Sequence, residues 1–306
     1  MQINININDD LKGKRLDSVI SDLIVTCSRK KAACLIDQGD ILVNNYKKKS
    51  GYKLKKNDIV TGFVKDFFDS NSIIEPENIF LDIVFEDDHI IIINKKAGMV
   101  VYPAPGNFRS TLVNALLFHF PFIENTCSEK IRSGIVHRLD KNTSGLIVIA
   151  KTAQALSFLQ KEFKYRRVQK KYLALVCGNL PCDQGIIDDP ISRHPVKKEI
   201  MSVNYEKGKS ALTFYRLKKR FKSACFVEVI IKTGRTHQIR VHFYNMGNPL
   251  LGDTVYQFKR YRKKNIVSRQ MLHSCELSFR HPYSGEKLSF YSPLPKDFEE
   301  ILLSLE

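Results

Sequence analysis

One carboxylate stands among three basic or potentially basic side chains in the stretch GIVHRLDKNTSGLIVIAK, residues 134–151. Asp140 follows His137 and Arg138, precedes Lys141, and is followed by the apolar run LIVIA. A carboxylate can attack as a nucleophile or remove a proton, and a nearby cation favours its ionised form. A lone acid between cations is more often a structural ion pair, so a catalytic role needs support from elsewhere in the chain.

Two later stretches supply candidate partners for Asp140. The run KKYLALVCG begins with two lysines followed by Tyr172, and TGRTHQIRVHF places Arg235 at the start of a predicted helix and Arg240 within it. Because Ile239 is expected to face the core, we predict that Arg240 points away from the packing, at the rim of a site. For Tyr172 an ordinary strand aromatic remains the alternative.

These residues need rigid elements to hold them, and the sequence predicts such elements. The run LIVIA is typical of a buried strand, which would anchor Asp140. Further strands are predicted within residues 81–95 and at KKYLALVCG and ACFVEVIIKTG, and helices at STLVNALLFHF, TAQALSFLQKEFKYRR and RTHQIRVHFYNMG. Strands and helices alternate without a regular βαβ rhythm. We therefore expect an α+β domain over residues 76–306, built on a mixed, largely antiparallel sheet.

Residues 1–75 are predicted to form a separate small domain that ends in a linker. The run RLDSVISDLI predicts a helix with Leu16, Val19, Ile20, Leu23 and Ile24 on one buried stripe. A second helix, RKKAACLIDQ, has Ser28 as its N-cap and Gly39 as its stop, and a strand DILVN leads into a turn at Asn44–Asn45.

Basic side chains surround this small predicted domain. Arg29 and Lys30 lie at the start of its second helix, where free N–H groups attract phosphate. We expect these two residues to bind RNA. A solvated lysine face is the alternative for the basic run YKKKSGYKLKKNDIV.

Composition limits the class of partner. The chain of 306 residues carries 49 Lys and Arg against 32 Asp and Glu, a net charge of +17. That excess predicts attraction to polyanions, nucleic acid first and an anionic membrane second. The apolar runs are too short to span a bilayer. Seven scattered cysteines without a CxxC pair predict buried, reduced thiols and a cytoplasmic location, and no His/Cys group has zinc spacing, so no metal is expected.

Several long motifs, in order, resemble the RluA family of pseudouridine synthases from about residue 81 to residue 306. Within the family the resemblance is nearest to the enzymes of large-subunit (23S) ribosomal RNA. The motifs are AGMVVYPAPGN, TLVNALL, GIVHRLDKNTSGLIVIAKT, DDPISRHPVKK, TGRTHQIRVHF, NPLLGDTVY and LHSCELSFRHPYSG. The chain departs from the family at Lys96, where Pro is usual, and at Tyr102, where His is usual.

The N-terminal stretches RLD, SRKKA, LIDQGDILVN and LKKNDIV resemble an S4 RNA-binding domain. Asn45 stands where that family usually has Gly, and Asn tolerates a positive φ better than most residues.

The resemblance implies isomerisation of uridine in RNA to pseudouridine, without a metal, nucleotide or redox cofactor. It implies that Asp140 is the catalytic carboxylate and Arg240 its salt-bridge partner. Tyr172 would stack on the target base, and Arg138 would fill the gap that the extruded base leaves, with Arg235 as a further RNA contact. Whether Asp140 attacks the sugar, attacks the ring or removes a proton stays open.

We expect a monomer whose partner is large-subunit rRNA or a ribosomal particle, with no membrane and no cofactor. Three alternatives remain open from the sequence. The chain could modify another RNA such as tRNA, it could be a non-catalytic RNA-binding assembly factor, or it could be a glycosylase that releases the base.

Overall fold

The computed structural model describes residues 2–24, 27, 29–63, 74–103, 107–126, 133–197, 200–262 and 267–306. The chain divides into two compact units, Met1–Ser72 and Ile73–Glu306. Helices in the described ranges are all too short or too polar to cross a membrane.

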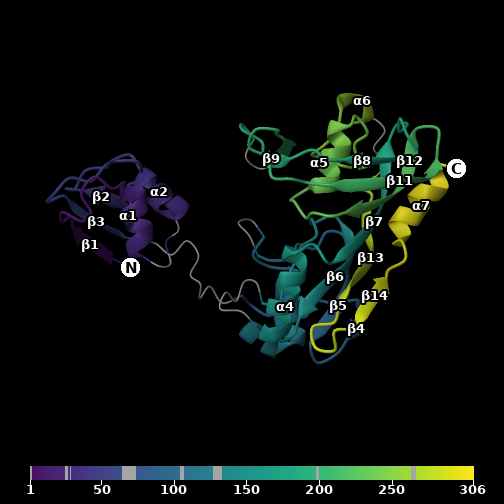
Figure 1. The fold of residues 1–306 in the computed structure, drawn as a ribbon, viewed down its shortest axis with the longest axis horizontal. Helices are drawn as coiled ribbons and strands as arrows, with labels where there is room; N and C mark the ends of the chain where they lie inside the picture. Colours follow the sequence, from purple (N-terminus) through teal and green to yellow (C-terminus); the bar gives the residue numbers. More distant parts are fainter. Residues whose placement is uncertain are drawn as a thin grey trace. The chain divides into compact units, whose positions relative to one another are not determined.

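The first unit is a three-stranded antiparallel sheet packed with two helices (Figure 1). Its strands β1 (Gln2–Asn6), β3 (Ile59–Phe63) and β2 (Ile41–Val43) lie in that order, and the helices are α1 (Leu16–Leu23) and α2 (Arg29–Gln38). Gly39 follows α2 with a φ of +87°, as expected of a helix stop. Asn44 and Asn45 have φ values of 53° and 64°, which confirms the predicted turn without a glycine.

Two details of this unit differ from the prediction or lie outside the described residues. Leu16, Val19, Ile20 and Ile24 are buried, but Leu23 is 50% exposed, so the buried stripe of α1 is narrower than predicted. The predicted N-cap Ser28 and the side chain of Lys30 lie outside the described residues.

The second unit is built on a nine-stranded sheet in which the described strands pair antiparallel except for β6 and β13. This confirms the mixed, largely antiparallel sheet that the sequence predicts. Its strand order is β4 (Ile83–Glu86), β5 (Ile90–Lys95), β6 (Ser144–Ala150), β13 (Leu272–Arg280), β7 (Gln169–Cys177), β12 (Ala224–Ile231), β11 (Thr213–Arg220) and β8 (Gln184–Ile187), with β14 (Lys287–Tyr291) paired to β13. The strands β9 (Ile191–Arg193) and β10 (Met201–Val203) form a separate antiparallel pair.

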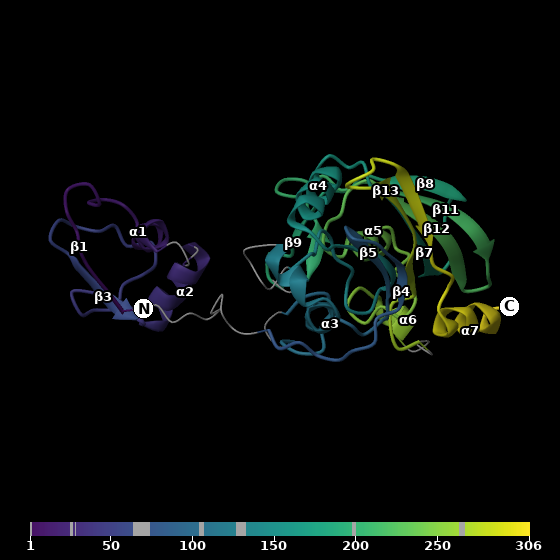
Figure 2. The same ribbon diagram turned by 90° about the horizontal axis from the view of Figure 1, so that it is seen from below.

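Alternation along the central strands gives this sheet two buried faces. Ile91, Ile93 and Ile147 point into one core with α3 (Leu112–His119) and α5 (Gln238–Asn245). Ile92 and Val148 point to the opposite face, where α4 (Ala153–Lys164) packs. The C-terminal α7 (Lys296–Ser304) packs on Leu175 and Met271, and Figure 2 shows α3 and α7 on different sides of the strands.

Two short helices complete the described elements, the 3-10 helix η1 (Pro121–Thr126) and α6 (Lys259–Arg262). Thr111 caps α3 in a capping box with Asn114. The helix α5 begins at Gln238, later than predicted, because His237 before it has a left-handed φ of 57°.

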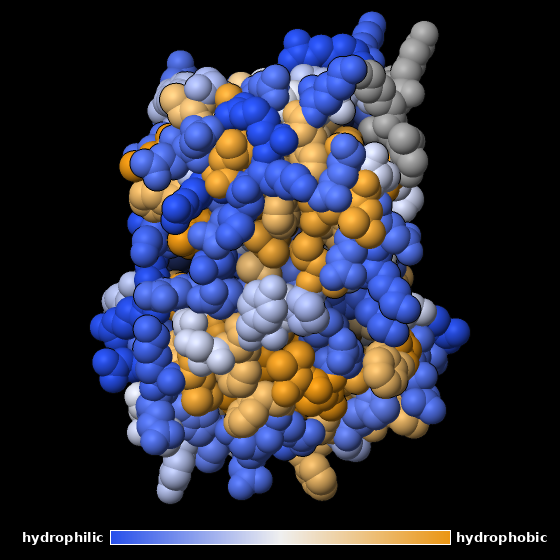
Figure 3. All heavy atoms as spheres, turned by 90° about the vertical axis from the view of Figure 1, so that its right-hand side faces the viewer, coloured by the Kyte–Doolittle hydropathy of each residue, from blue (hydrophilic) through white to orange (hydrophobic). Residues whose placement is uncertain are grey.

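Every residue of β6 is buried, as predicted for LIVIA. The expectation of buried thiols was wrong in part, because Cys34 and Cys182 are exposed while Cys27, Cys177, Cys225 and Cys275 are buried. Cys127 lies outside the described residues. The face of the molecule in Figure 3 is largely hydrophilic with interspersed hydrophobic residues.

Candidate active site

Asp140 lies in the loop that leads directly into β6. Hydrogen bonds from other segments hold the backbone of this loop. The Thr143 N–H donates to the Asp140 carbonyl at 3.0 Å, and the Gly98 N–H donates to the Lys141 carbonyl at 2.9 Å. Beneath the loop, the ammonium group of Lys95 donates to three carbonyls, those of Lys96, Met99 and Lys141, at 2.9, 2.9 and 3.2 Å. The Asp140 carboxylate therefore lies on a loop whose backbone is held by hydrogen bonds from neighbouring segments, which fixes its position.

Arg240 joins two carboxylates. Its Nη1 donates to Oδ2 of Asp140 at 3.1 Å, while Nε and Nη2 donate to the two oxygens of Asp253 at 2.7 and 3.0 Å. Burial lowers the pKa of Arg240, but the hydrogen bonds and charge of Asp253, then those of Asp140, raise it overall. The guanidinium is therefore a permanent cation that orients Asp140 through a hydrogen bond to Oδ2.

The predicted position of Arg240 was wrong in one respect. The residue is only 6% exposed and lies within the packing, not at the rim. The bidentate pair with Asp253 makes this burial possible, because an unpaired guanidinium would not be stable in that environment.

Tyr172 lies on β7 opposite Ser274 of β13, and β13 also pairs with the first residues of β6. The strand β13 thus places the tyrosine beside the loop of Asp140. Tyr172 is 6% exposed. Burial raises the pKa of its hydroxyl, despite a hydrogen bond with Ser274, so the phenol is protonated at neutral pH.

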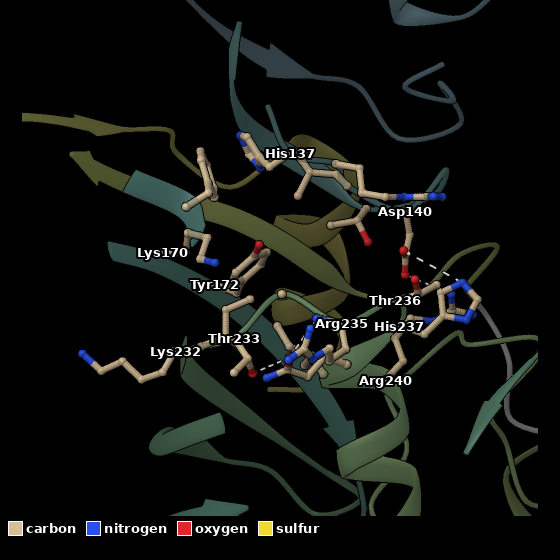
Figure 4. A pocket seen from close by; sticks show the side chains of 18 of the residues that line it. His137, Asp140, Lys170, Tyr172, Lys232, Thr233, Arg235, Thr236, His237 and Arg240 are labelled. Carbon is tan, nitrogen blue, oxygen red and sulfur yellow. Dashed lines mark hydrogen bonds and ion pairs between the residues drawn. The ribbon is translucent and has the colours of Figure 1, made fainter. Parts of the chain in front are cut away.

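A cavity of 540 Å³ brings these residues together (Figure 4). Asp140 is the one acidic residue of its described lining, whereas seven lining residues are cationic: Arg138, Lys164, Arg166, Lys170, Lys232, Arg235 and Arg240. Figure 4 shows Tyr172 and Lys170 together on β7, with Asp140 near Thr236 and His237. A pocket with one carboxylate and many cations suits an anionic substrate.

Two histidines border the site as neutral groups. His237 Nε2 lies 3.9 Å from Asp140 Oδ1, and its Nδ1 bonds the Tyr256 hydroxyl at 2.8 Å. Burial lowers the pKa of His237, although the charge of Asp140 opposes this. Burial, with the charge of Lys170, lowers the pKa of His137 to about 3, and its Nε2 accepts a bond from the Val148 N–H at 3.0 Å.

Both predicted RNA-contacting arginines of the second unit line the cavity. Arg138 is exposed, and its Nη1 donates to the Tyr102 hydroxyl at 2.6 Å. Its guanidinium also lies 5.0 Å from the centre of that ring. Arg235 is held by its Nε, which donates to the Ser210 carbonyl at 3.0 Å. The departure from the family pattern at Tyr102 thus supplies a contact for Arg138.

Sequence reasoning missed three residues of this site. Asp253 lies in NPLLGDTVY, a stretch used only for the family resemblance, and its buried side chain anchors Arg240. Lys95 carries the loop of Asp140, and Lys170 lines the cavity. The role of Lys95 could have been predicted from its position at the end of the apolar strand IIIIN, because a buried charged group needs hydrogen-bond partners.

The two predicted RNA-binding residues of the first unit both lie on α2. The Arg29 side chain is 57% exposed, and its Nε lies 3.5 Å from Asp17 Oδ2. For Lys30 only the backbone is described, at the start of α2.

Comparison with known proteins finds a matching family model and similar proteins of nearly the same length. Residues 89–245 match the family model "RNA pseudouridylate synthase". The chain is 39% identical to ribosomal large subunit pseudouridine synthase D of Pasteurella multocida, over 96% of this chain and 92% of that protein. The protein of that name from Vibrio cholerae is 38% identical, over 100% of this chain and 95% of its own.

A solved structure also matches. Human RNA pseudouridylate synthase domain containing 1 superposes with a TM-score of 0.58 at 25% identity, over 75% of this chain and 96% of that one.

Proposed function

The chain belongs to the RNA pseudouridylate synthase family, and from this premise we propose that it isomerises uridines of large-subunit rRNA to pseudouridine at Asp140. The relatives named as ribosomal large subunit enzymes support the choice of RNA. The observation that carries the proposal is the buried guanidinium of Arg240, which holds the side chain of Asp140 at the wall of a cationic cavity.

The two carboxylate oxygens of Asp140 have different roles in this proposal. Arg240 occupies Oδ2, so Oδ1 is the oxygen that can act on the nucleotide. In the reaction the bond between C1′ and N1 breaks, a bond between C1′ and C5 forms, N1 gains a proton and C5 loses one. Tyr172 packs against the base as a protonated phenol, and no sugar or base leaves the cavity.

One assay tests the proposed function against its rivals. The protein is incubated with rRNA labelled in uridine, and the nucleosides and free bases are separated. We expect pseudouridine. Free uracil would show a glycosylase, and neither product would favour a non-catalytic binding protein. Product from tRNA but not from rRNA would assign a different substrate.

Arg138 is proposed to occupy the space from which the target uridine is extruded. Removing the side chain should slow the reaction on a stacked hairpin uridine by about tenfold or more, because unstacking costs a few kcal/mol. An unpaired, flexible substrate should be affected much less. The measurement is the single-turnover rate of Arg138→Ala on both substrates, with Arg138→Lys as the control that keeps the charge but not the planar group. Equal loss on both substrates would contradict the proposed role.

The first unit is proposed to be an S4-like RNA-binding domain, comprising residues 1–75 with its linker, that holds rRNA near the catalytic domain of residues 76–306. Deleting residues 1–72 should weaken rRNA binding and flatten its salt dependence, by about 0.7–0.9 in log–log slope for each phosphate that the domain neutralises. The single-turnover rate at saturating RNA should change much less, since the cavity is built from the second unit. If the truncated protein binds rRNA with the affinity and salt slope of the full-length protein, the lysines of the first unit form only a solvated surface.

A further inference from the structure

A second hollow lies next to the catalytic cavity, and we propose that it binds the phosphate backbone of the RNA chain leading away from the target uridine. The inference rests on the proposed function and extends it to the path of the substrate. The hollow has a volume of 590 Å³ and is lined by β7, β12, β13, β14 and the segment after α4.

The two hollows adjoin each other. Arg166, Lys170, Ile231 and Lys232 line both of them. A nucleotide bound at Asp140 remains joined to its neighbours through phosphates, so its chain must leave the catalytic cavity past some part of the rim. The shared cationic residues provide a path along which the RNA backbone can leave the catalytic cavity.

The charges of the second hollow are unbalanced. Its two acids are already paired, Glu162 with Arg167 at 3.0 Å and Glu276 with Lys171 at 3.0 Å. Five further cations of its lining have no carboxylate within ion-pair distance in the described part of the chain: Arg166, Lys170, Lys232, Arg280 and Lys287. Burial lowers the pKa of Lys170 to about 8, and a phosphate in the hollow would oppose that effect.

Two of these cations face each other. Arg280 of β13 and Lys287 of β14 are direct partners in an antiparallel register. Like charges in directly opposed positions destabilise a sheet, so the pair is unfavourable in the free protein and becomes favourable when an anion lies across it. This juxtaposition is the strongest indication of an anionic ligand.

The lining favours backbone contact over reading of bases. The one aromatic residue among the described lining residues is Phe279, and it is 2% exposed. Without an accessible ring, bases have no stacking surface. Contacts from Lys and Arg to phosphates position an RNA chain without selecting its sequence.

The test is the double variant Arg280→Gln/Lys287→Gln in the full-length protein. Neither residue lines the catalytic cavity. The control is Arg216→Gln/Lys218→Gln, which removes the same charge from two exposed positions of β11 that line neither hollow. The probe is a labelled oligouridylate of about twenty nucleotides, long enough to cover both hollows, whose binding is measured at several salt concentrations.

We expect the test variant to bind with a log–log salt slope that is smaller by about 1.5, since each phosphate contact contributes about 0.7–0.9, and to bind several-fold more weakly at low salt. The control should keep the wild-type slope. Thermal unfolding of the test variant should stay at or above the wild-type temperature, because the opposed charges are gone.

A slope and affinity shared by the test variant, the control and the wild type would overturn the inference. This outcome is distinct from failure of the proposed function, which shows as wild-type protein that forms no pseudouridine in rRNA. Binding of the oligouridylate does not require catalysis, so each result can be obtained without the other.

Discussion

Replacement of Asp140 by Asn should abolish pseudouridine formation while leaving RNA binding nearly intact. Asparagine keeps the shape of the side chain but cannot attack a carbon or accept a proton as a carboxylate does. We expect the single-turnover rate to fall by about 10²–10⁴-fold or more, the range for loss of an acid–base group. Affinity for rRNA should stay within about twofold, since an acid makes no attractive phosphate contact.

The folded state should tolerate this change. Arg240 keeps both hydrogen bonds to Asp253 when Asp140 loses its charge, so no buried cation is left alone. The control is Asp183→Asn, which removes a carboxylate that is 78% exposed and paired with Arg220. It should retain full activity. Appreciable activity in purified Asp140→Asn protein would falsify the assignment of this residue.

Local patterns predicted the elements that carry the site. The run LIVIA forms the fully buried β6, and KKYLALVCG forms β7 with Tyr172 facing the cavity. These elements follow from short-range rules, because a strand inside a two-sided sheet needs apolar residues at every position. The turn at Asn44–Asn45 followed in the same way from the conformations that asparagine tolerates.

Long-range polar contacts could not be predicted in that way. Helical periodicity placed Ile239 in the core and therefore excluded Arg240 from it. In the structure both are buried, because Asp253, from the loop after the helix, provides an ion pair that periodicity does not take into account. The contact between Arg138 and Tyr102 has the same origin, since its partners come from different loops.

The start of α5 shows a third limit of local rules. The sequence favoured a helix from Arg235, but the Gln238 side chain accepts bonds from the Thr233 hydroxyl and the Arg235 N–H, at 2.7 and 3.0 Å. These bonds hold the preceding residues in a loop. His237 then takes a left-handed conformation, which histidine adopts more readily than most residues. In this loop conformation Arg235 and His237 both line the cavity.

Asp253→Asn should have the second large effect, and on stability as well as rate. The Asp253 side chain is fully buried and the Arg240 side chain is 7% exposed. Loss of one partner of a buried pair costs about 3–5 kcal/mol, and we expect the lower end because Asp140 still contacts the guanidinium. Activity should fall because Arg240 is less firmly oriented. Chemical denaturation and single-turnover kinetics measure the two effects.

A double variant separates stability from chemistry. In Arg240→Met/Asp253→Asn the buried cation is removed together with its anion, while the Asn side-chain oxygen can still accept the bonds that Asp253 takes from the Val255 and Tyr256 N–H groups. Removing both charges avoids the uncompensated buried charge that a single substitution of either partner leaves. We therefore expect much of the stability to return and the activity to stay low, because Asp140 no longer has its guanidinium partner. Recovery of activity along with stability would show that Arg240 serves only the fold. Stability without activity would place the guanidinium in the chemistry of Asp140.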